Sequence, residues 1–143
     1  MILVDANLLL YAYDPRAAQH EASRVWLEST LAGPGLVRFA WLTLWAFLRI
    51  STNPRVYEHP LSFDEAEAHV SAWLAQPSCG ILEPGERHWE ILRGLTRQGQ
   101  AVGPLVMDAV LAAIALEHGA TLHTTDRDFA RFPGLRWIDP LSA

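Results

Sequence analysis

The stretch Met1-Ile-Leu-Val-Asp5 opens the sequence with four apolar residues that stop at an acid. A short apolar run bounded in this way is typical of a buried β-strand. The next residues, 6–13, are almost all apolar and end at the breaker Asp14-Pro15. The chain is therefore predicted to begin with a buried strand, and Asp5 lies at the carboxyl end of that strand.

Strand-like and helix-like segments alternate along the rest of the chain. Further strands are predicted over 36–40, 80–83, 120–124 and 135–138, with the weakest signal over 80–83. Helices are predicted over 17–31, 41–51, 62–76, 84–98 and 105–117, and a turn with a short helix over 125–132. This alternation predicts an α/β fold, a sandwich of helices around a mostly parallel sheet, in which ligands bind beyond the carboxyl ends of the strands.

Length and composition favour one domain. The 143 residues, of which 50% are hydrophobic, are enough for a single core, so we expect one domain over 1–143. No apolar run approaches the ~20 residues of a membrane-spanning helix, and the first residues lack the basic start of a signal peptide. The lone cysteine, Cys79, argues against a disulfide framework and a multi-cysteine metal site. We therefore expect a cytoplasmic protein with no membrane contact.

The basic residues are all arginine. The absence of lysine excludes a P-loop and a Schiff-base enzyme. With 16 acidic and 11 basic residues the net charge is −5, which disfavours an open nucleic-acid-binding surface. A nucleic-acid enzyme whose acids are gathered around metal ions is compatible with this charge.

Four aspartates occupy positions at which an α/β sheet holds its ligands. Asp5 follows the first strand, and Asp126 and Asp128 follow the strand over 120–124. Asp108 lies in the first turn of the helix over 105–117. Converging carboxylates need a compensating cation, and Mg²⁺ or Mn²⁺ prefers oxygen ligands. Each aspartate also has a structural explanation as a helix cap or a first-turn acid, so their shared placement is what favours a metal site.

Other catalytic chemistries fit the sequence less well. The six histidines show no zinc-type spacing. The chain has neither a glycine-rich phosphate loop nor a serine nucleophile elbow. A phosphoaspartyl hydrolase would carry a second aspartate two residues after the first, where this chain has Asn7.

Four segments resemble the PIN-domain VapC toxins, in the same order along the chain. They are Asp5-Ala6-Asn7-Leu8-Leu9-Leu10-Tyr11-Ala12, Phe47-Leu48-Arg49-Ile50-Ser51-Thr52-Asn53-Pro54-Arg55, Met107-Asp108-Ala109-Val110-Leu111-Ala112-Ala113-Ile114-Ala115 and Gly119-Ala120-Thr121-Leu122-His123-Thr124-Thr125-Asp126-Arg127-Asp128-Phe129. The pattern is closest to the branch found in mycobacteria and related actinobacteria. The resemblance implies a PIN-like α/β/α sandwich and a metal-dependent endoribonuclease, the toxin of a toxin–antitoxin pair. Such toxins are inhibited by a VapB antitoxin and usually form homodimers.

The resemblance also implies a set of functional residues, carried over by position. The metal ligands would be Asp5, Asp108 and Asp126, with Asp128 beside them as a further catalytic residue and Asn7, Thr124 and Thr125 as supporting polar residues. The bound ion would be Mg²⁺ or Mn²⁺, and the substrate would be RNA.

One position departs from the family pattern. Many members carry a glutamate just before the Phe-Leu-Arg of the second segment, where this chain has Ala46, and no acid occurs between Glu28 and Glu58. We therefore expect a weakly bound first metal ion and a second that arrives with the RNA phosphate, if at all. The alternative function is a catalytically weak PIN-like module that binds antitoxin or RNA. A DNA-cleaving 5′-nuclease is disfavoured because the chain is too short for the extra duplex-binding parts of that class.

Basic and aromatic side chains offer candidate contacts. Arg49 and Arg127 are candidate RNA contacts, although Arg127 can instead pair with neighbouring aspartates. Trp41 and Trp45 are four residues apart and should share one helix face. Core packing is the default expectation for these two and for Trp26, and a groove for an amphipathic antitoxin segment is the alternative.

Overall fold

A five-stranded parallel sheet forms the centre of the protein. The computed structural model describes residues 1–142. The strands are β1 (Ile2–Val4), β2 (Val37–Phe39), β3 (Cys79–Ile81), β4 (Thr121–His123) and β5 (Trp137–Ile138). Their order is β3-β2-β1-β4-β5, and every pair is parallel. The predicted α/β fold is confirmed, and its sheet is wholly parallel.

The direction in which the chain crosses the sheet reverses beside β1. The chain moves from β1 to β2 and β3 on one side and returns to β4 and β5 on the other. Such a reversal leaves a crevice outside the carboxyl ends of β1 and β4. Val4 lies opposite His123 in this pair of strands, and the Asp5 backbone N–H donates to the His123 carbonyl at 3.0 Å. The residues that follow the two strands therefore emerge side by side.

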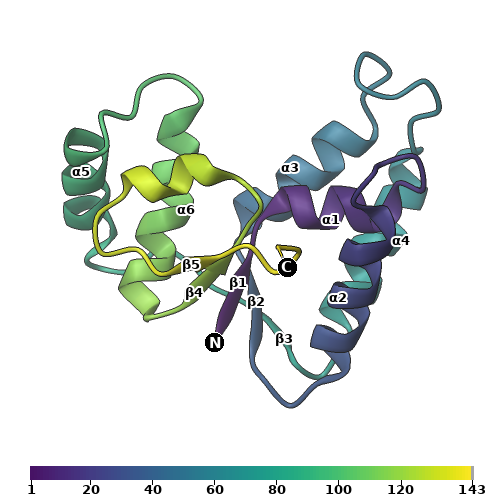
Figure 1. The fold of residues 1–143 in the computed structure, drawn as a ribbon, viewed down its shortest axis with the longest axis horizontal. Coiled ribbons are helices and arrows are strands. Elements are labelled where there is room, and N and C mark those ends of the chain that lie inside the picture. The colour runs from purple at the N-terminus through teal and green to yellow at the C-terminus, as the bar shows by residue number, and fades with distance from the viewer. Residues whose placement is uncertain (143) are drawn as a thin grey trace.

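Helices cover both faces of the sheet (Figure 1). They are α1 (Ala6–Tyr13), α2 (His20–Ala32), α3 (Trp41–Ser51), α4 (Phe63–Leu74), α5 (His88–Gln98), α6 (Leu105–His118) and the 3-10 helix η1 (Arg127–Arg131). Figure 1 shows α1, α2 and α4 on one side of the sheet and α5 and α6 on the other. Adjacent residues of β1 pack on opposite faces of the sheet. Leu3 belongs to the core beneath α5 and α6, and Val4 belongs to the core beneath α1 and α2.

Helix α6 is apolar on nearly all sides because it packs between the sheet and α5. Ala109, Ala112 and Ala113 are fully buried, and such small side chains let the helix approach the sheet closely. The helix ends at Gly119, whose φ of 67° lies in the left-handed region that favours glycine. Neither α6 nor any other helix in residues 1–142 is long and apolar enough to cross a membrane.

Two helices begin later than the sequence predicted. Helices α2 and α5 start at residues 20 and 88 rather than at 17 and 84. Before α5, the Glu117 carboxylate accepts hydrogen bonds from the backbone N–H groups of Gly85 and Arg87, at 2.8 and 3.0 Å. This contact between distant segments holds the chain in a turn, which local patterning could not reveal. The weak strand predicted over 80–83 is present as Cys79–Ile81.

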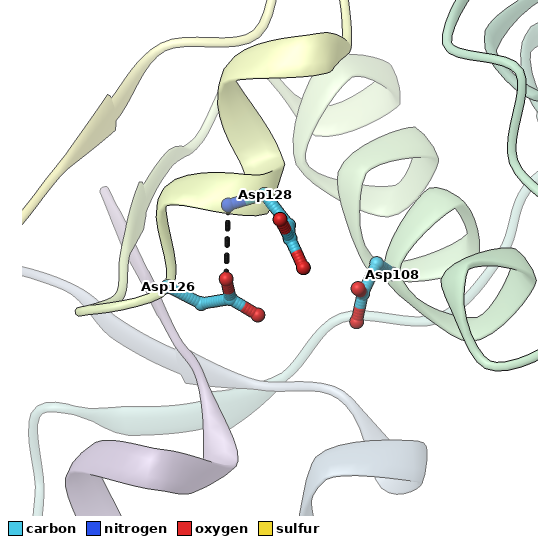
Figure 2. A group of neighbouring side chains, drawn as sticks. All are labelled: Asp108, Asp126 and Asp128. Carbon is cyan, nitrogen blue, oxygen red and sulfur yellow. Dashed lines mark hydrogen bonds between the residues drawn. The ribbon is translucent and has the colours of Figure 1, made fainter.

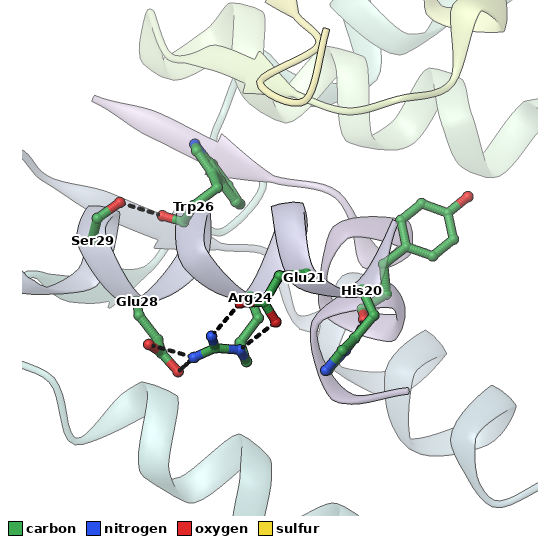
Figure 3. Close-up of polar contacts among 7 residues, drawn as sticks. His20, Glu21, Arg24, Trp26, Glu28 and Ser29 are labelled. Atoms are coloured by element: carbon green, nitrogen blue, oxygen red, sulfur yellow. Dashed lines mark hydrogen bonds and ion pairs between the residues drawn. The ribbon is translucent and has the colours of Figure 1, made fainter. Parts of the chain in front are cut away.

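Helix α2 carries surface ion pairs and one aromatic contact with the sheet. Arg24 pairs with Glu21 at 2.6 Å and with Glu28 at 2.9 Å (Figure 3). These pairs contribute little to stability because solvent screens them. Trp26 stacks on His123 with ring centroids 5.6 Å apart, which ties α2 to β4. Packing is therefore confirmed for Trp26.

The default expectation of core packing is wrong for the other two tryptophans. Trp41 and Trp45 are 40% and 62% exposed. Helix α3 buries its opposite face instead, through Thr43, Leu44 and Phe47. The sequence of α3 is apolar nearly all round, so its pattern did not indicate which face would be covered.

Candidate active site

Three aspartates from two distant segments converge at the crevice beside β1. One carboxylate oxygen from each of Asp108, Asp126 and Asp128 lies within 4.8 Å of the others. Figure 2 shows these side chains pointing toward one another, Asp108 from the first turn of α6 and the other two from the start of η1. A cation at the centre of the group would be within reach of all three carboxylates.

Asp126 combines a structural role with its place in the cluster. Its Oδ1 accepts a hydrogen bond from the Asp128 backbone N–H at 2.9 Å and so caps η1. Its Oδ2 makes no hydrogen bond within residues 1–142. The capping explanation is therefore correct for this aspartate, and the cap orients the carboxylate toward the cluster (Figure 2).

Asp5 lies outside this group of three carboxylates and is linked to Asp126 through the buried hydroxyl of Thr124. Thr124 Oγ1 donates to Asp5 Oδ2 at 2.7 Å and accepts from the Asp126 backbone N–H at 3.0 Å. Asp5 Oδ1 accepts from the Ala6 backbone N–H at 2.7 Å and caps α1. Thr124 therefore links the segment after β1 to the segment after β4 and holds the Asp5 carboxylate in one orientation.

A cleft of about 480 Å³ lies between α1, α3 and α6, and Asp128 is not among the residues that line it. Asp5, Asp108 and Asp126 line this cleft together. Ala46 and Arg49 line it from α3. The position at which many PIN-domain toxins carry a glutamate therefore faces the cluster, and here it contributes a methyl group instead of a carboxylate.

Two buried polar atoms beside the cluster have no hydrogen-bond partner within residues 1–142. Asn7 donates from Nδ2 to Thr125 Oγ1 at 2.9 Å, but Asn7 Oδ1 and Thr43 Oγ1 are unpartnered. Both residues line the cleft. Because buried polar groups are nearly always satisfied, these atoms indicate that water or a ligand completes the site. Thr43 was missed by sequence reasoning, although it precedes Ala46 by three residues and so shares its helix face.

No basic side chain among residues 1–142 is paired with the aspartates, although the positive charge of Arg131 acts against the rise in the pKa of Asp108. None of the four forms an ion pair within residues 1–142. Burial, followed by the charges of Asp126, Asp5 and Asp128, raises the pKa of Asp108 to about 6. Burial also raises the pKa of Asp5, although its two hydrogen bonds act in the opposite direction. A hard divalent cation would relieve this repulsion, so the oxygen donors fit Mg²⁺ or Mn²⁺.

The two candidate RNA contacts lie in different places. Arg49 is exposed on α3 and lines the aspartate cleft. Arg127 lines a separate hollow beside β5. No ion pair joins Arg127 to the neighbouring aspartates within residues 1–142. The geometry therefore favours Arg49, and not Arg127, as a contact for a substrate in the cleft.

Residues 2–135 match the PIN domain family. Ribonuclease VapC37 of Mycobacterium tuberculosis is 44% identical over 141 residues, which cover 98% of this chain and 97% of that protein. Ribonuclease VapC33 of the same species is 40% identical over 141 residues and 99% of both chains.

Solved structures with the same fold include toxins and their complexes. VapBC2 from Rickettsia felis, bound to a promoter DNA fragment, matches with a TM-score of 0.69 and 19% identity, over 96% of this chain and 98% of that one. Mycobacterium tuberculosis VapC20, described as a sarcin-ricin loop cleaving toxin, matches with a TM-score of 0.67 and 18% identity, over 95% and 99% of the two chains. The chain therefore belongs to the PIN-domain family and, within it, to the VapC branch.

Proposed function

We propose that this chain is the endoribonuclease toxin of a type II toxin–antitoxin system and hydrolyses RNA phosphodiester bonds at its aspartate cluster. The observation that carries the proposal is the meeting of Asp5, Asp108 and Asp126 in one cleft. Identities of 40% and 44% to proteins named as VapC ribonucleases support it. Residues 1–143 would form a single PIN domain.

Asp5, Asp108 and Asp126 are the proposed ligands of Mg²⁺ or Mn²⁺. They offer hard oxygen donors and form no ion pair with a basic side chain within residues 1–142. Oxygens of Asn7 and Thr43 that have no partner within these residues adjoin them in the cleft. When bound, such an ion supplies an activated water and stabilises negative charge on the reacting phosphate.

The remaining roles in the proposed reaction belong to side chains around the ion. Asp128 orients the attacking water or accepts its proton at a carboxylate oxygen. Thr124 keeps the Asp5 carboxylate in place through their 2.7 Å hydrogen bond. Asn7 and Thr125 form a second brace through their 2.9 Å hydrogen bond.

We propose three partners for the chain. The substrate is RNA, and Arg49 contacts one of its phosphates from the wall of the cleft. The inhibitor is a VapB-type antitoxin, in line with a structure of the same fold that is described as a toxin–antitoxin complex from Klebsiella pneumoniae. The protein forms a homodimer, as its resemblance to VapC toxins implies.

Ala46 favours one alternative function. Because α3 adds no carboxylate to the cleft, a bound ion has one charged ligand fewer than in many family members. The chain could then act as a module that binds antitoxin or RNA without efficient turnover. Metal-dependent RNA cleavage distinguishes the two functions.

The first test is cleavage of total cellular RNA by the antitoxin-free protein with Mg²⁺, Mn²⁺ or EDTA. We expect discrete cuts that require metal. Asp5→Asn should lower cleavage by at least about 100-fold, because loss of even an outer-shell partner of a metal costs 10–100-fold. The fold should persist because asparagine still caps α1.

A matched control for this variant is Asp64→Asn. Asp64 is exposed on α4, outside the cleft, so its substitution makes the same charge change away from the cluster. It should cleave like the wild type. Normal cleavage by Asp5→Asn would show that the site assignment is wrong. A folded wild type that makes no cuts with either metal would support the binding module.

A further inference from the structure

Two further hollows adjoin the aspartate cleft along α3 and α6, because all three share lining residues. Leu42 and Met107 line the cleft and two adjoining hollows of about 420 and 410 Å³. The nearer hollow shares Ala46 and Arg49 with the cleft, and the farther hollow shares Trp45 with the nearer one. The cleft and the two hollows together are called the α3–α6 groove.

Trp45 presents its indole to solvent inside this groove. The exposed fractions of Trp45 and Met107 are 62% and 52%. Arg49 follows Trp45 by one helical turn, so the two side chains are neighbours on α3 and line the same hollow. An exposed aromatic ring and a guanidinium group therefore stand next to each other at the entrance to the aspartates.

We propose that the α3–α6 groove binds a single-stranded segment of RNA beside the scissile phosphate, with an unpaired base stacked on Trp45 and an adjacent phosphate bound by Arg49. The inference rests on the proposed ribonuclease function and specifies its substrate as RNA that is unpaired at the cut. Stacking needs a free face of the base, which neighbouring bases cover in a duplex. Aromatic platforms beside basic groups are typical of sites for single strands.

Continuity with the aspartate cleft favours RNA over other occupants of the groove. Among residues 1–142, Arg49 is the one basic side chain that lines the groove, and the farther hollow also holds Glu83. The groove opens into the cleft in which the scissile phosphate would be held, so a strand cut there passes along the adjoining surface. Arg49 lines both the cleft and the adjoining hollow, where the next phosphate of that strand would lie. A second copy of the chain or an apolar peptide would cover Trp45 but would leave the guanidinium of Arg49, which lines the aspartate cleft, without a role.

The test combines a change in the protein with a change in the RNA. The strongest site that the wild type cuts in cellular RNA is synthesised as an oligonucleotide, with versions that carry an abasic ribose at each position flanking the cut. Trp45→Ala should lower kcat/KM by about tenfold, as for the loss of one base–aromatic stack. Trp45→Phe should retain most activity. One abasic substitution should lower the wild-type kcat/KM by a similar factor and leave Trp45→Ala unaffected, because the stacking partner is already gone.

Trp89→Ala is the matched control, because Trp89 is 68% exposed on α5, outside the groove. It should cleave like the wild type, and thermal melts establish that all variants fold. The inference is wrong if Trp45→Ala retains the wild-type kcat/KM. It is also wrong if the abasic RNA lowers the kcat/KM of Trp45→Ala by the same factor as it lowers that of the wild type. It is also wrong if Trp45→Ala converts a dimer into a monomer in light scattering, because the groove is then an interface between copies.

Failure of the proposed function would give a different result. If the wild type cuts no RNA with either metal, ribonuclease activity is absent, and RNA binding then decides the inference. In anisotropy measurements with a fluorescent single-stranded RNA, Trp45→Ala should bind about tenfold more weakly than the wild type and Trp89→Ala. Equal binding by all three proteins overturns the inference.

Discussion

At the scale of single residues, Asp108 is held among like charges at a cost to stability. Burial and the neighbouring carboxylates raise its pKa from 3.8 to about 6. A raised pKa means that the folded protein binds this proton more tightly than the unfolded chain does. The stabilisation from the proton is therefore complete below a pH of 3.8 and is lost as the pH rises through about 6.

We expect Asp108→Asn to stabilise the metal-free protein at neutral pH by about 1 kcal/mol, after allowance for solvent screening of this partly exposed side chain. Urea unfolding at a series of pH values measures the effect. The difference in the free energy of unfolding between Asp108→Asn and the wild type should shrink as the pH falls from about 6 toward 3.8, because wild-type Asp108 then becomes neutral too. Equal stability of the two proteins at neutral pH would contradict the repulsion.

Ala46 allows a substitution that should strengthen metal binding. It lines the cleft together with Asp5, Asp108 and Asp126, so Ala46→Glu would add a carboxylate there. We expect the affinity for Mn²⁺, measured by calorimetry, to rise by about tenfold or more, since loss of outer-shell partners alone costs 10–100-fold. Ala46→Gln is the control of equal size without the charge. Two tightly bound ions in the free wild type would argue against the weak binding predicted from Ala46.

At the scale of elements, α4 begins with a capping box, and Ser62 and Glu65 have the three-residue spacing that this motif requires. Ser62 Oγ accepts from the Glu65 backbone N–H at 3.1 Å, and the Glu65 carboxylate accepts from the Ser62 backbone N–H at 3.0 Å. These hydrogen bonds lower the pKa of Glu65. Helix α4 packs on α3 through Trp73 and Phe47, whose rings are 4.8 Å apart, and it does not line the aspartate cleft.

We therefore expect Ser62→Ala to lower the free energy of unfolding by about 1 kcal/mol and to leave RNA cleavage unchanged. Ser62→Asp should retain most of the stability, because aspartate is an equally good N-cap. Denaturant unfolding and the RNA-cleavage assay measure the two effects separately. A loss of cleavage in folded Ser62→Ala would mean that α4 influences the cleft.

At the scale of the whole molecule, the cluster depends on the packing of three segments. Asp5 comes from the junction of β1 and α1, Asp126 from the segment after β4, and Asp108 from α6. These segments lie close together only in the folded state. An ion bound between them should therefore stabilise the entire protein.

We expect Mg²⁺ or Mn²⁺ at ten times its Kd to add roughly 1.4 kcal/mol of stability, or about 3–6 °C in Tm for a domain of this size. EDTA should reverse the rise, and Asp126→Asn should abolish it while Asp64→Asn retains it. Thermal melts at matched ionic strength measure these shifts. A Tm that responds to neither metal would contradict an ion site in the free protein.

Much of the site could be predicted because its signals are local. Asp5 directly follows the apolar strand β1, and Asp126 follows β4 after two intervening residues. Ala46 lies in a stretch without acids. Thr43 and the exposed face of α3 could not be predicted in the same way. The surroundings of α3 are set by its contacts with α1 and α4, and a helix that is apolar nearly all round does not reveal which of its faces these neighbours cover.

Local patterning is sufficient to predict the alternation of strands and helices, the capping-box spacing at Ser62 and the position of acids at strand ends, because periodicity and chain order are local properties. The tertiary structure alone decided the strand order β3-β2-β1-β4-β5 and the approach of Asp108 to Asp126 and Asp128. It also decided that Trp45 lies in an open groove. These features depend on how distant segments pack, since strand pairing and helix burial are chosen by the free energy of the whole fold.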